Sequence, residues 1–280
     1  MLLGLILLAI IFAAGFLFLH PPVWFPVAIT SAAVAYDRQF LWTLWIAGIL
    51  FLAAHLVLAW IVLRRKDAGE NACSTGIRAS WLAAVAMIAV EVALAAHGTS
   101  PLTAGAPRDF ETIEVWAHQF AWNFRYAGPD GVFGRQDPSL IGNSNPLGLD
   151  PTDPHSSDDI VSLNEMHVPV NRNVILIVTS KDVIHSVSIE SMRIGQDAIP
   201  GSEIPIWFKP VKLGTYEIVC AQLCGANHAL MRATVVVDTD ADYQSWLHDE
   251  EQLANPTPVA PAAPAAAAPA ASAAPAGGTK

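Results

Sequence analysis

The sequence has few basic residues for its length. Lys and Arg together number 15 against 25 Asp and Glu, which gives a formal net charge of −10. Nucleic-acid binding depends on clusters of Lys and Arg that neutralise phosphates. The charge balance therefore excludes a nucleic-acid partner and suits a basic protein partner instead.

Charge of either sign is nearly missing from three long apolar stretches before residue 100. Residues 1–19 are uncharged but lack the positively charged start of a typical signal peptide, so a cleaved signal and a retained helix both stay open. Residues 41–63 form an uncharged run long enough to cross a bilayer core. Residues 79–98 are long enough for a second span, with one acid, Glu91, inside it. We expect a membrane hairpin of two helices, or three membrane helices where residues 1–19 are retained.

Four basic residues lie between the two expected spans, namely Arg64, Arg65, Lys66 and Arg78. The positive-inside rule places such a short loop in the cytoplasm. The chain after residue 99 then lies on the outer side, in an oxidising, periplasm-like compartment. Cys73 falls in the cytoplasmic loop and is interpreted as an incidental thiol.

Composition divides the chain into five segments. Residues 1–40 hold the signal or extra helix with a connecting segment, residues 41–99 the hairpin, and residues 100–110 a turn-rich linker. Residues 111–254 form a domain on the outer side. Residues 255–280 are a Pro/Ala tail with almost no charge and nothing to bury, which we expect to be disordered.

The segment 111–254 alternates short β-rich runs with Gly, Pro, Asn and Asp, a pattern typical of an antiparallel sandwich or barrel. The runs are TIEVWAHQFAWNFRYAG, VILIVTS, HSVSIES, IPIWFKP, GTYEIVC and MRATVVV. Residues 128–159 are too rich in Gly, Pro and Asp for regular structure and predict a long surface loop. Residues 241–254 predict a short closing helix with Trp246 and Leu247 packed inward.

Cysteine is scarce, and two of the three cysteines stand four residues apart in CAQLCGANHALM, residues 220–231. A disulfide between Cys220 and Cys224 closes an awkwardly short loop and leaves His228 and Met231 unexplained. Zinc is disfavoured because methionine is not a usual zinc ligand. Soft thiolate and thioether ligands together with imidazole select copper.

A copper site here can hold one metal ion or two. A mononuclear electron-transfer copper uses one Cys, two His and a weak axial Met, and this stretch has one thiolate too many for it. Two thiolates can each bridge two copper ions, and such a centre needs one imidazole for each copper. His185, in KDVIHSVSIES, supplies the second imidazole. A histidine in a strand is nevertheless more often structural than a metal ligand.

Three stretches together resemble subunit II of cytochrome c oxidase, the family that carries a dinuclear copper centre called CuA. They are QFAWNFRYAG at 119–128, DVIHSVSIESMRIGQDAIPG at 182–201 and GTYEIVCAQLCGANHALMRATVVV at 214–237. The two helices of the hairpin fit as well, whereas residues 1–40 and the tail lie outside the resemblance. The resemblance implies a Greek-key β-barrel of the cupredoxin type and a hairpin that docks on the catalytic subunit.

The resemblance also implies a ligand set, position by position. The terminal imidazole ligands are His185 and His228, the bridging thiolates are Cys220 and Cys224, the weak thioether ligand of one copper is Met231, and the backbone carbonyl that weakly binds the other copper is that of Gln222.

The sequence departs from the family pattern at three places. Position 222 is usually Glu, whose side chain helps to bind magnesium; neutral Gln222 is a weaker ligand for a hard cation, which puts that magnesium site in doubt. The aromatic stretch H-Q-W-x-W reads HQFAW here, so Phe120 takes the place where electrons are thought to enter and Trp122 is the second aromatic residue. Both also fit plain packing inside the barrel. Arg78 replaces the acid that often opens a proton channel, and Glu91, deeper in the same helix, fits either proton uptake or a structural polar contact.

No C-x-x-C-H motif occurs, so no haem is expected in this chain and electrons come from a separate cytochrome c or equivalent carrier. We expect a multi-pass protein of a bacterial inner membrane with its copper domain on the periplasmic side. It would pass electrons to haem in the catalytic subunit I, where oxygen is reduced and protons are pumped. Two alternatives stay open: a membrane-anchored copper-binding or copper-delivery protein, and the structural subunit II of a quinol oxidase, whose copper ligands are typically lost.

Overall fold

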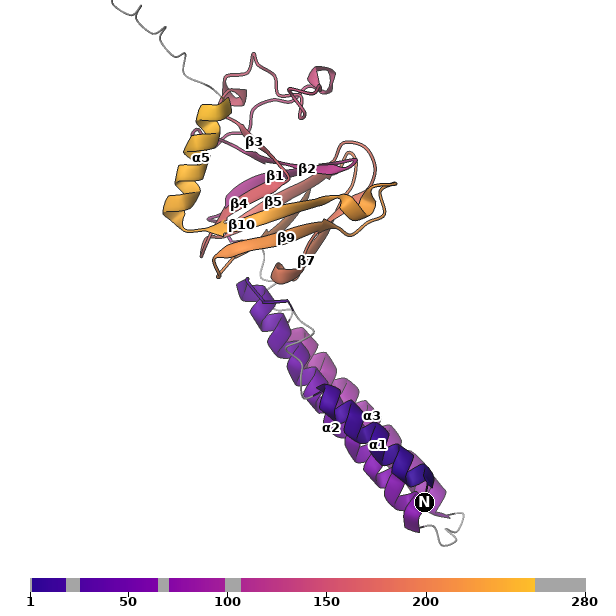
Figure 1. Ribbon diagram of the computed structural model, residues 1–280. Helices are drawn as coiled ribbons and strands as arrows, with labels where there is room; N and C mark the ends of the chain where they lie inside the picture. Colours follow the sequence, from indigo (N-terminus) through magenta and orange to yellow (C-terminus); the bar gives the residue numbers. More distant parts are fainter. Residues whose placement is uncertain (1, 19–25, 65–70, 99–106, 255–280) are drawn as a thin grey trace, which may run out of the picture.

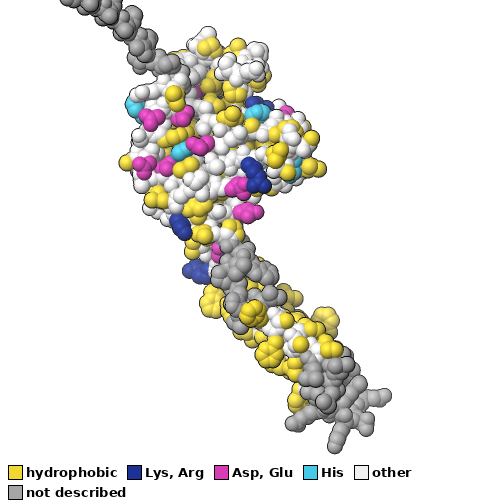
Figure 2. All heavy atoms as spheres, in the orientation of Figure 1, with side chains coloured by type: hydrophobic (Ala, Val, Ile, Leu, Met, Phe, Trp, Pro, Cys, Tyr) yellow, Lys and Arg dark blue, Asp and Glu magenta, His cyan; other side chains and the backbone are white. Residues whose placement is uncertain are grey.

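The computed structural model describes residues 2–18, 26–64, 71–98 and 107–254. These residues form a rod of helices attached to a β domain (Figure 1). The rod consists of α1 (Leu2–Phe18), α2 (Ser31–Arg64) and α3 (Asn71–Gly98). Where the rod is coloured in Figure 2, its side chains are mostly apolar, whereas most of the coloured charged side chains lie on the β domain. The division into an apolar rod and a charged domain agrees with the sequence prediction.

Within the described residues, one helix is long and apolar enough to cross a membrane, namely α2 over Ser31–Val57. The predicted span over residues 41–63 lies inside α2, and the helix extends ten residues further toward the N-terminus than the uncharged run on which the prediction rested. A charge is accommodated near the start of α2 because Asp37 pairs with Arg193 of the β domain, at 2.8 Å. The apolar part of α3, Trp81–Ala96, is shorter, so the second predicted span is the weaker of the two.

α3 begins at Asn71, inside the segment predicted as a loop. Cys73 and Arg78 therefore belong to the helix, and the placement of Cys73 in a loop was wrong. Several residues around Cys73 are polar and weak helix formers, so a prediction from apolar residues places the start of the helix too late. Glu91 accepts a hydrogen bond from Thr43 Oγ1 of α2 at 3.1 Å. This contact joins the two helices and gives the acid of α3 a polar partner.

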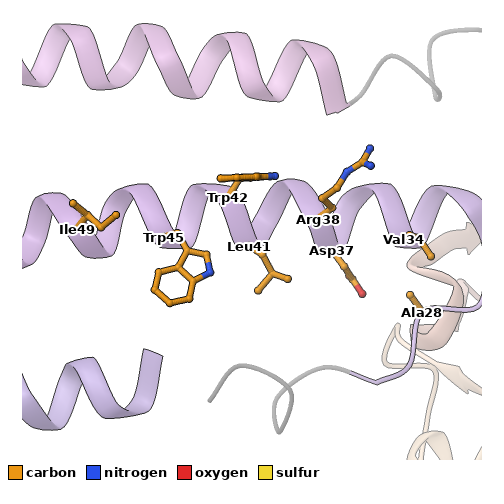
Figure 3. A pocket seen from close by; sticks show the side chains of 8 residues that line it. All are labelled: Ala28, Val34, Asp37, Arg38, Leu41, Trp42, Trp45 and Ile49. Carbon is orange, nitrogen blue, oxygen red and sulfur yellow. The ribbon is translucent and has the colours of Figure 1, made fainter. Parts of the chain in front are cut away.

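A shallow groove of about 750 Å³ follows the first half of α2 (Figure 3). Trp42, Trp45 and Ile49 contribute apolar walls, and Asp37 and Arg38 lie toward the β domain. The side chain of Trp42 is 60% exposed. α2 therefore keeps a broad apolar face open within the part of the chain that the structure describes.

The β domain is a sandwich of two five-stranded sheets (Figure 1). The first sheet has the order β3 (Ile160–Leu163), β2 (Ala121–Tyr126), β1 (Glu111–His118), β5 (Val174–Ser180) and β8 (Ile204–Phe208). The second has the order β4 (Glu165–Pro169), β10 (Arg232–Asp238), β9 (Gly214–Cys220), β6 (His185–Ile189) and β7 (Ile194–Ala198). All six predicted runs contain strands, and β3, β4 and β7 were not predicted. The two-sheet arrangement agrees with the expected cupredoxin-like domain.

Two of the strand pairs are parallel, β1 with β5 and β10 with β4. The expectation of a purely antiparallel sandwich was therefore wrong for these pairs. The β-rich runs show where strands lie, but the direction of pairing depends on the connections between them. Parallel strands need a crossover of a dozen or more residues, and both parallel pairs join strands that are far apart in the chain.

The core lies between the two sheets. In β1 every second side chain from Ile113 to Ala117 is buried. Burial of a side chain the size of Ile113 or Val115 contributes about 1.5–3 kcal/mol. α5 (Asp240–Ala254) closes one end of the sandwich (Figure 1). The predicted closing helix is confirmed, and its Trp246 and Leu247 pack against the core as expected.

The segment before α2 is part of this core, although the sequence predicted only a connecting segment there. Ile29 and Thr30 are both fully buried, at 0% exposure. The Ile29 N–H donates to the Ser191 carbonyl at 2.9 Å, and the Ile29 carbonyl accepts from the Val211 N–H at 2.8 Å. Thr30 Oγ1 accepts from the Ala33 N–H at 3.0 Å and so caps α2. These contacts join α2 directly to the β domain.

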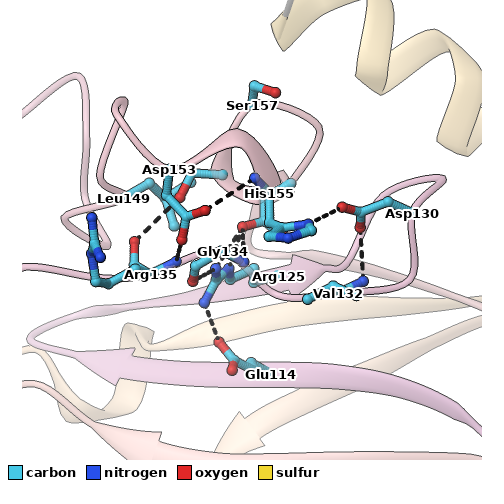
Figure 4. Close-up of polar contacts among 12 residues, drawn as sticks. Glu114, Arg125, Asp130, Val132, Gly134, Arg135, Leu149, Asp153, His155 and Ser157 are labelled. Atoms are coloured by element: carbon cyan, nitrogen blue, oxygen red, sulfur yellow. Dashed lines mark hydrogen bonds and ion pairs between the residues drawn. The ribbon is translucent and has the colours of Figure 1, made fainter.

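The long loop predicted over residues 128–159 is confirmed. Its helical turns are η2 (Pro138–Leu140) and η3 (Pro154–Ser156). Arg125 of β2 holds the loop from below, with its guanidinium 2.5 Å from the Asp159 carboxylate and 3.0 Å from Glu114 (Figure 4). Arg125 also donates to the Gly134 carbonyl. The charge of the buried Arg125 is thereby compensated, and the loop is fixed to the sheet.

Candidate metal centre

The stretch CAQLCGANHALM forms a compact loop between β9 and β10. Cys220 is the last residue of β9, and β10 begins one residue after Met231. The Cys220 N–H donates to the Met231 carbonyl at 3.1 Å, which closes the base of the loop. Gly225 has a φ of +140°, a region that favours glycine, and the turn η5 (His228–Leu230) follows it. The two ends of the predicted ligand stretch therefore lie side by side.

The two thiols of this loop face each other without being bonded. Cys220 Sγ lies 3.8 Å from Cys224 Sγ, well beyond the roughly 2.05 Å of a disulfide bond. Both cysteines are free and buried. A disulfide is thereby excluded, and the sulfur atoms are spaced so that a metal ion can lie between them.

Each thiol faces one imidazole. His185, at the start of β6, has its Nδ1 3.9 Å from Cys220 Sγ. On the other side, His228 Nδ1 lies 3.6 Å from Cys224 Sγ. The donor atoms of His185, Cys220 and Cys224 all lie within 4.8 Å of one another, close enough to hold a metal ion.

The two weaker ligands of the predicted set lie at opposite ends of the sulfur pair. Met231 Sδ is 3.8 Å from Cys224 Sγ, and the Gln222 carbonyl oxygen is 3.2 Å from Cys220 Sγ. The Gln222 side chain belongs to an exposed residue, so the carbonyl is the part of Gln222 that faces the cluster. The fold thus brings together all six residues that the sequence singled out as ligands.

Most of the cluster is buried. His185 is 0%, Met231 1% and Cys224 5% exposed, whereas His228 is half-buried. Burial, together with the neighbouring Cys220 thiol, raises the pKa of Cys224 to about 11. Without metal the site therefore holds a neutral thiol, and metal binding has to displace its proton.

Two residues that sequence reasoning missed contact the ligands directly. Asp182 Oδ1 lies 2.9 Å from His185 Nε2, and Gln119 Nε2 donates to the Cys224 carbonyl at 2.5 Å. Partial burial raises the pKa of the Asp182 carboxyl, but hydrogen bonds from Gln119 and His185 outweigh it and hold the pKa below its ordinary value. An acid three residues before a candidate ligand histidine was the signal available in the sequence.

The two aromatic residues singled out in the sequence lie in different surroundings. Phe120 is partly buried and packs on the loop backbone, since a Cβ placed on Gly225 would lie 3.0 Å from its Cζ. Trp122 is fully buried, and its ring meets His185 edge-on with centroids 6.2 Å apart. The side chain that approaches both the loop and solvent is therefore Phe120, whereas Trp122 supports a ligand from inside.

Three exposed apolar residues, which we call the apolar rim, stand next to ligand residues in the sequence. Leu223 is 78% and Leu230 75% exposed, and both lie in the cysteine loop. Ile184, next to His185, is 44% exposed. Exposed apolar side chains that gather around a buried site mark a surface for another molecule.

Comparison with known proteins identifies the β domain. The family described as cytochrome c oxidase subunit II, periplasmic domain, matches residues 111–239. The chain is 33% identical over 258 residues to the alternative cytochrome c oxidase subunit 2 of Bradyrhizobium diazoefficiens, covering 90% of this chain and 92% of the relative. It is 36% identical over 165 residues to cytochrome c oxidase subunit 2 of Thermostichus vulcanus, covering 59% of this chain and 40% of that relative.

A third relative, cytochrome c oxidase subunit 2 of Cereibacter sphaeroides, is 30% identical, with 54% of each chain covered. The chain thus spans about half the length or less of the second and third relatives. Among solved structures, the periplasmic domain of subunit II of the cytochrome oxidase of Bradyrhizobium japonicum is 30% identical with a TM-score of 0.40, covering 53% of this chain and 99% of that one. Because the chain matches the Bradyrhizobium diazoefficiens relative over nearly the whole length of both proteins, it belongs to the cytochrome c oxidase subunit II family.

Proposed function

We propose that this chain is the electron-accepting subunit of a respiratory cytochrome c oxidase and that its β domain holds a dinuclear CuA centre. His185 and His228 are the terminal ligands, Cys220 and Cys224 the bridging thiolates, and Met231 the thioether ligand. The Gln222 carbonyl is the last ligand. When bound, the copper pair takes up and releases one electron at a time.

The observation that carries the proposal is the arrangement of the soft ligands. Two facing thiols lie 3.8 Å apart, and each has an imidazole nitrogen beside it, at 3.9 Å from Cys220 and 3.6 Å from Cys224. Thiolate, thioether and imidazole ligands together favour copper over zinc or a hard cation. A mononuclear site of one Cys, two His and a Met leaves one of the two thiolates without a metal, so a pair of ions fits the ligand set better.

The residues of the chain have three tasks in this function. The loop and β6 hold the ligands at fixed positions, the core around Met231 and Trp122 keeps water out, and the apolar rim of Leu223 and Leu230 offers a contact surface. A cytochrome c-type donor docks at this rim, and its electron reaches the ligands by way of Phe120. The chain's negative charge speeds the encounter with a basic donor.

We infer that the helical rod lies in a bacterial inner membrane as a multi-pass anchor, with the β domain on the periplasmic side. The open apolar face of α2 suits the catalytic haem–copper subunit as a neighbour. That subunit reduces oxygen and couples the reaction to proton pumping. The hydrogen bond from Thr43 to Glu91 favours a structural role for this acid over proton uptake. Because the Gln222 side chain is neutral and a weak ligand for a hard cation, we propose no magnesium ion at this position.

The experiment that tests the proposal is copper analysis with electron paramagnetic resonance on the whole chain in detergent. Two coppers per chain sharing one unpaired electron are expected. Cys224→Ser should lose this signal, whereas Cys73→Ser, which changes the cysteine outside the loop, should keep it. One localised copper overturns the dinuclear centre and favours a copper-delivery protein. No retained copper overturns it in favour of a structural subunit.

A further inference from the structure

We propose that Asp182 and Gln119 are positioning residues of the metal centre, which fix the His185 ring and the Cys224 loop through the turn between β1 and β2. The inference deepens the proposed function and rests on it for the identity of the metal. It starts from two contacts that join separate parts of the chain.

The first contact selects the state of the His185 ring. Asp182 Oδ1 is 2.9 Å from His185 Nε2, and an ionised carboxylate only accepts hydrogen bonds. Nε2 therefore carries the hydrogen, and Nδ1 keeps its lone pair. Nδ1 is the nitrogen that lies 3.9 Å from Cys220 Sγ. Asp182 thus holds His185 in the one neutral tautomer that presents a ligand atom to the sulfur pair.

The Asp182 carboxylate is itself held in place by the backbone. The Gln119 N–H donates to Oδ2 at 2.7 Å, and the Val183 N–H donates to Oδ1 at 2.7 Å. The Ser180 hydroxyl lies 3.4 Å from Oδ1. Because both oxygens are engaged, the carboxylate is unable to rotate away from His185 without losing hydrogen bonds.

The second contact ties the cysteine loop to the same turn. While the backbone of Gln119 donates to Asp182, its side chain donates to the Cys224 carbonyl at 2.5 Å. A Cβ placed on Gly225 would lie 2.9 Å from Gln119 Nε2 and 3.0 Å from Phe120 Cζ. The turn is therefore packed directly on the backbone that follows Cys224.

Gln119 in this way joins two ligand-bearing loops that are far apart in the sequence. Its partners lie 63 and 105 residues further along the chain. Without this bridge, the position of His185 would depend on β6 and that of Cys224 on its own loop. A ligand set held before metal arrives loses less conformational freedom on binding, and outer partners of this kind contribute roughly 10–100-fold in metal affinity.

The test uses the whole chain in detergent and two readouts. Nitrogen-15 NMR of the metal-free chain reports the tautomer of the His185 ring. The rate at which a Cu(I) chelator withdraws copper reports how firmly the loaded site is held. The variants are Asp182→Ala, Asp182→Asn and Gln119→Ala. Matched controls are Asp249→Asn and Gln244→Ala, which change exposed residues of α5.

We expect the wild-type chain to show a hydrogen on His185 Nε2 and Asp182→Ala to lose this preference. Asp182→Asn keeps an oxygen that can accept from Nε2 and should restore the tautomer. Gln119→Ala keeps its backbone N–H, so the tautomer should stay, while copper leaves about tenfold faster because the Cys224 loop is released. Asp182→Ala should lose copper fastest, and both controls should match the wild type.

An unchanged His185 tautomer in Asp182→Ala, or unchanged copper withdrawal in Gln119→Ala, would overturn the respective positioning role. The NMR readout needs no metal, which separates this inference from the proposed function. A wild-type chain that holds no copper pair while its tautomer responds to Asp182→Ala refutes the CuA centre and supports the Asp182 contact. If the wild-type chain holds a copper pair and Asp182→Ala leaves the His185 tautomer unchanged, the CuA centre is supported and the role of Asp182 is refuted.

Discussion

His185 and His167 are both buried histidines of the second sheet, and the ring of each meets a carboxylate. His185 has Asp182 at Nε2, but its Nδ1 faces the Cys220 sulfur. His167, on β4, has Asp238 Oδ2 at 2.6 Å from Nδ1 and Glu165 Oε1 at 3.1 Å from Nε2. The two rings therefore differ in what the second nitrogen meets.

This difference separates a ligand from a structural side chain. A carboxylate oxygen lies within hydrogen-bond distance of each ring nitrogen of His167, so neither nitrogen is open to a metal ion. Its ring also stacks on Trp246 of α5, with centroids 4.2 Å apart and planes 11° apart. His167 thereby fastens the closing helix to the sheet. Burial and a carboxylate partner alone do not identify a metal ligand.

Replacing each of the two histidines in turn should affect copper content most. His185→Ala removes one imidazole of the pair, so the two-copper signal should disappear and affinity should fall by more than the roughly 10–100-fold that an outer partner contributes. His167→Ala should keep two coppers per chain. Metal analysis with paramagnetic resonance measures both. Equal copper loss in the two variants would contradict the assignment of His185 as a ligand and His167 as a structural residue.

The second largest effect is on stability, and here the variant of His167 should be the affected one. His167→Ala leaves Asp238 with a lost partner and removes the stack on Trp246, so the free energy of unfolding should fall by about 1–3 kcal/mol. Urea denaturation followed by tryptophan fluorescence measures the change. His248→Ala is the matched control, because His248 lies on α5 with its side chain 66% exposed. A similar loss in both variants would mean that His167 does not fasten the helix.

A smaller effect should distinguish the contributions of the two carboxylates around His167 to stability. Asp238→Asn keeps an oxygen that accepts from the ring, so it should cost about 0.5–1.5 kcal/mol. Glu165→Gln should cost less, because the Glu165 side chain is 52% exposed against 17% for Asp238 and water replaces an exposed partner. The same denaturation experiment ranks them. The reverse order would assign the main contact to Nε2.

The sequence predicted the strands with strong β-rich runs and the ligand stretch, because both are local. Five of the six proposed ligands lie within one stretch of twelve residues, and the fold only has to add His185. The short strands β3, β4 and β7 were not predicted, since β3 has only four residues and the sequences EMHVP and IGQDA lack a clear β-rich pattern. His167 was missed with β4.

Contacts between residues far apart in the chain could not be predicted from the sequence, for a physical reason. His167 meets Asp238 71 residues away, and Ile29 completes a core whose strands begin at residue 111. Such partners depend on strand order and on parallel or antiparallel pairing, which periodicity does not specify. The charge pattern likewise gave no reason to extend α2 past Asp37, because its partner Arg193 lies 156 residues along the chain.

The smallest expected effect concerns a third histidine–carboxylate pair, which is exposed. His155 Nδ1 lies 2.5 Å from Asp130 Oδ2 in the long loop (Figure 4). The hydrogen bond to Asp130 raises the pKa of His155, and the hydrogen bond to His155 lowers the pKa of Asp130. The His155 contribution is complete below its unfolded pKa and disappears as pH rises through the raised folded pKa. The Asp130 contribution disappears as pH falls through its lowered folded pKa.

The pair therefore acts only between these two limits, and solvent screening keeps its contribution small. Asp130→Asn should move the pKa of His155 down toward its ordinary value, as measured by an NMR titration of the ring, and should leave copper content unchanged. Asp249→Asn, an exposed acid on α5, should not move it. If His155 titrates at the same pH with and without the Asp130 carboxylate, the contact does not persist in solution. A carboxylate beside a histidine would then matter only where burial holds it, as at His185 and His167.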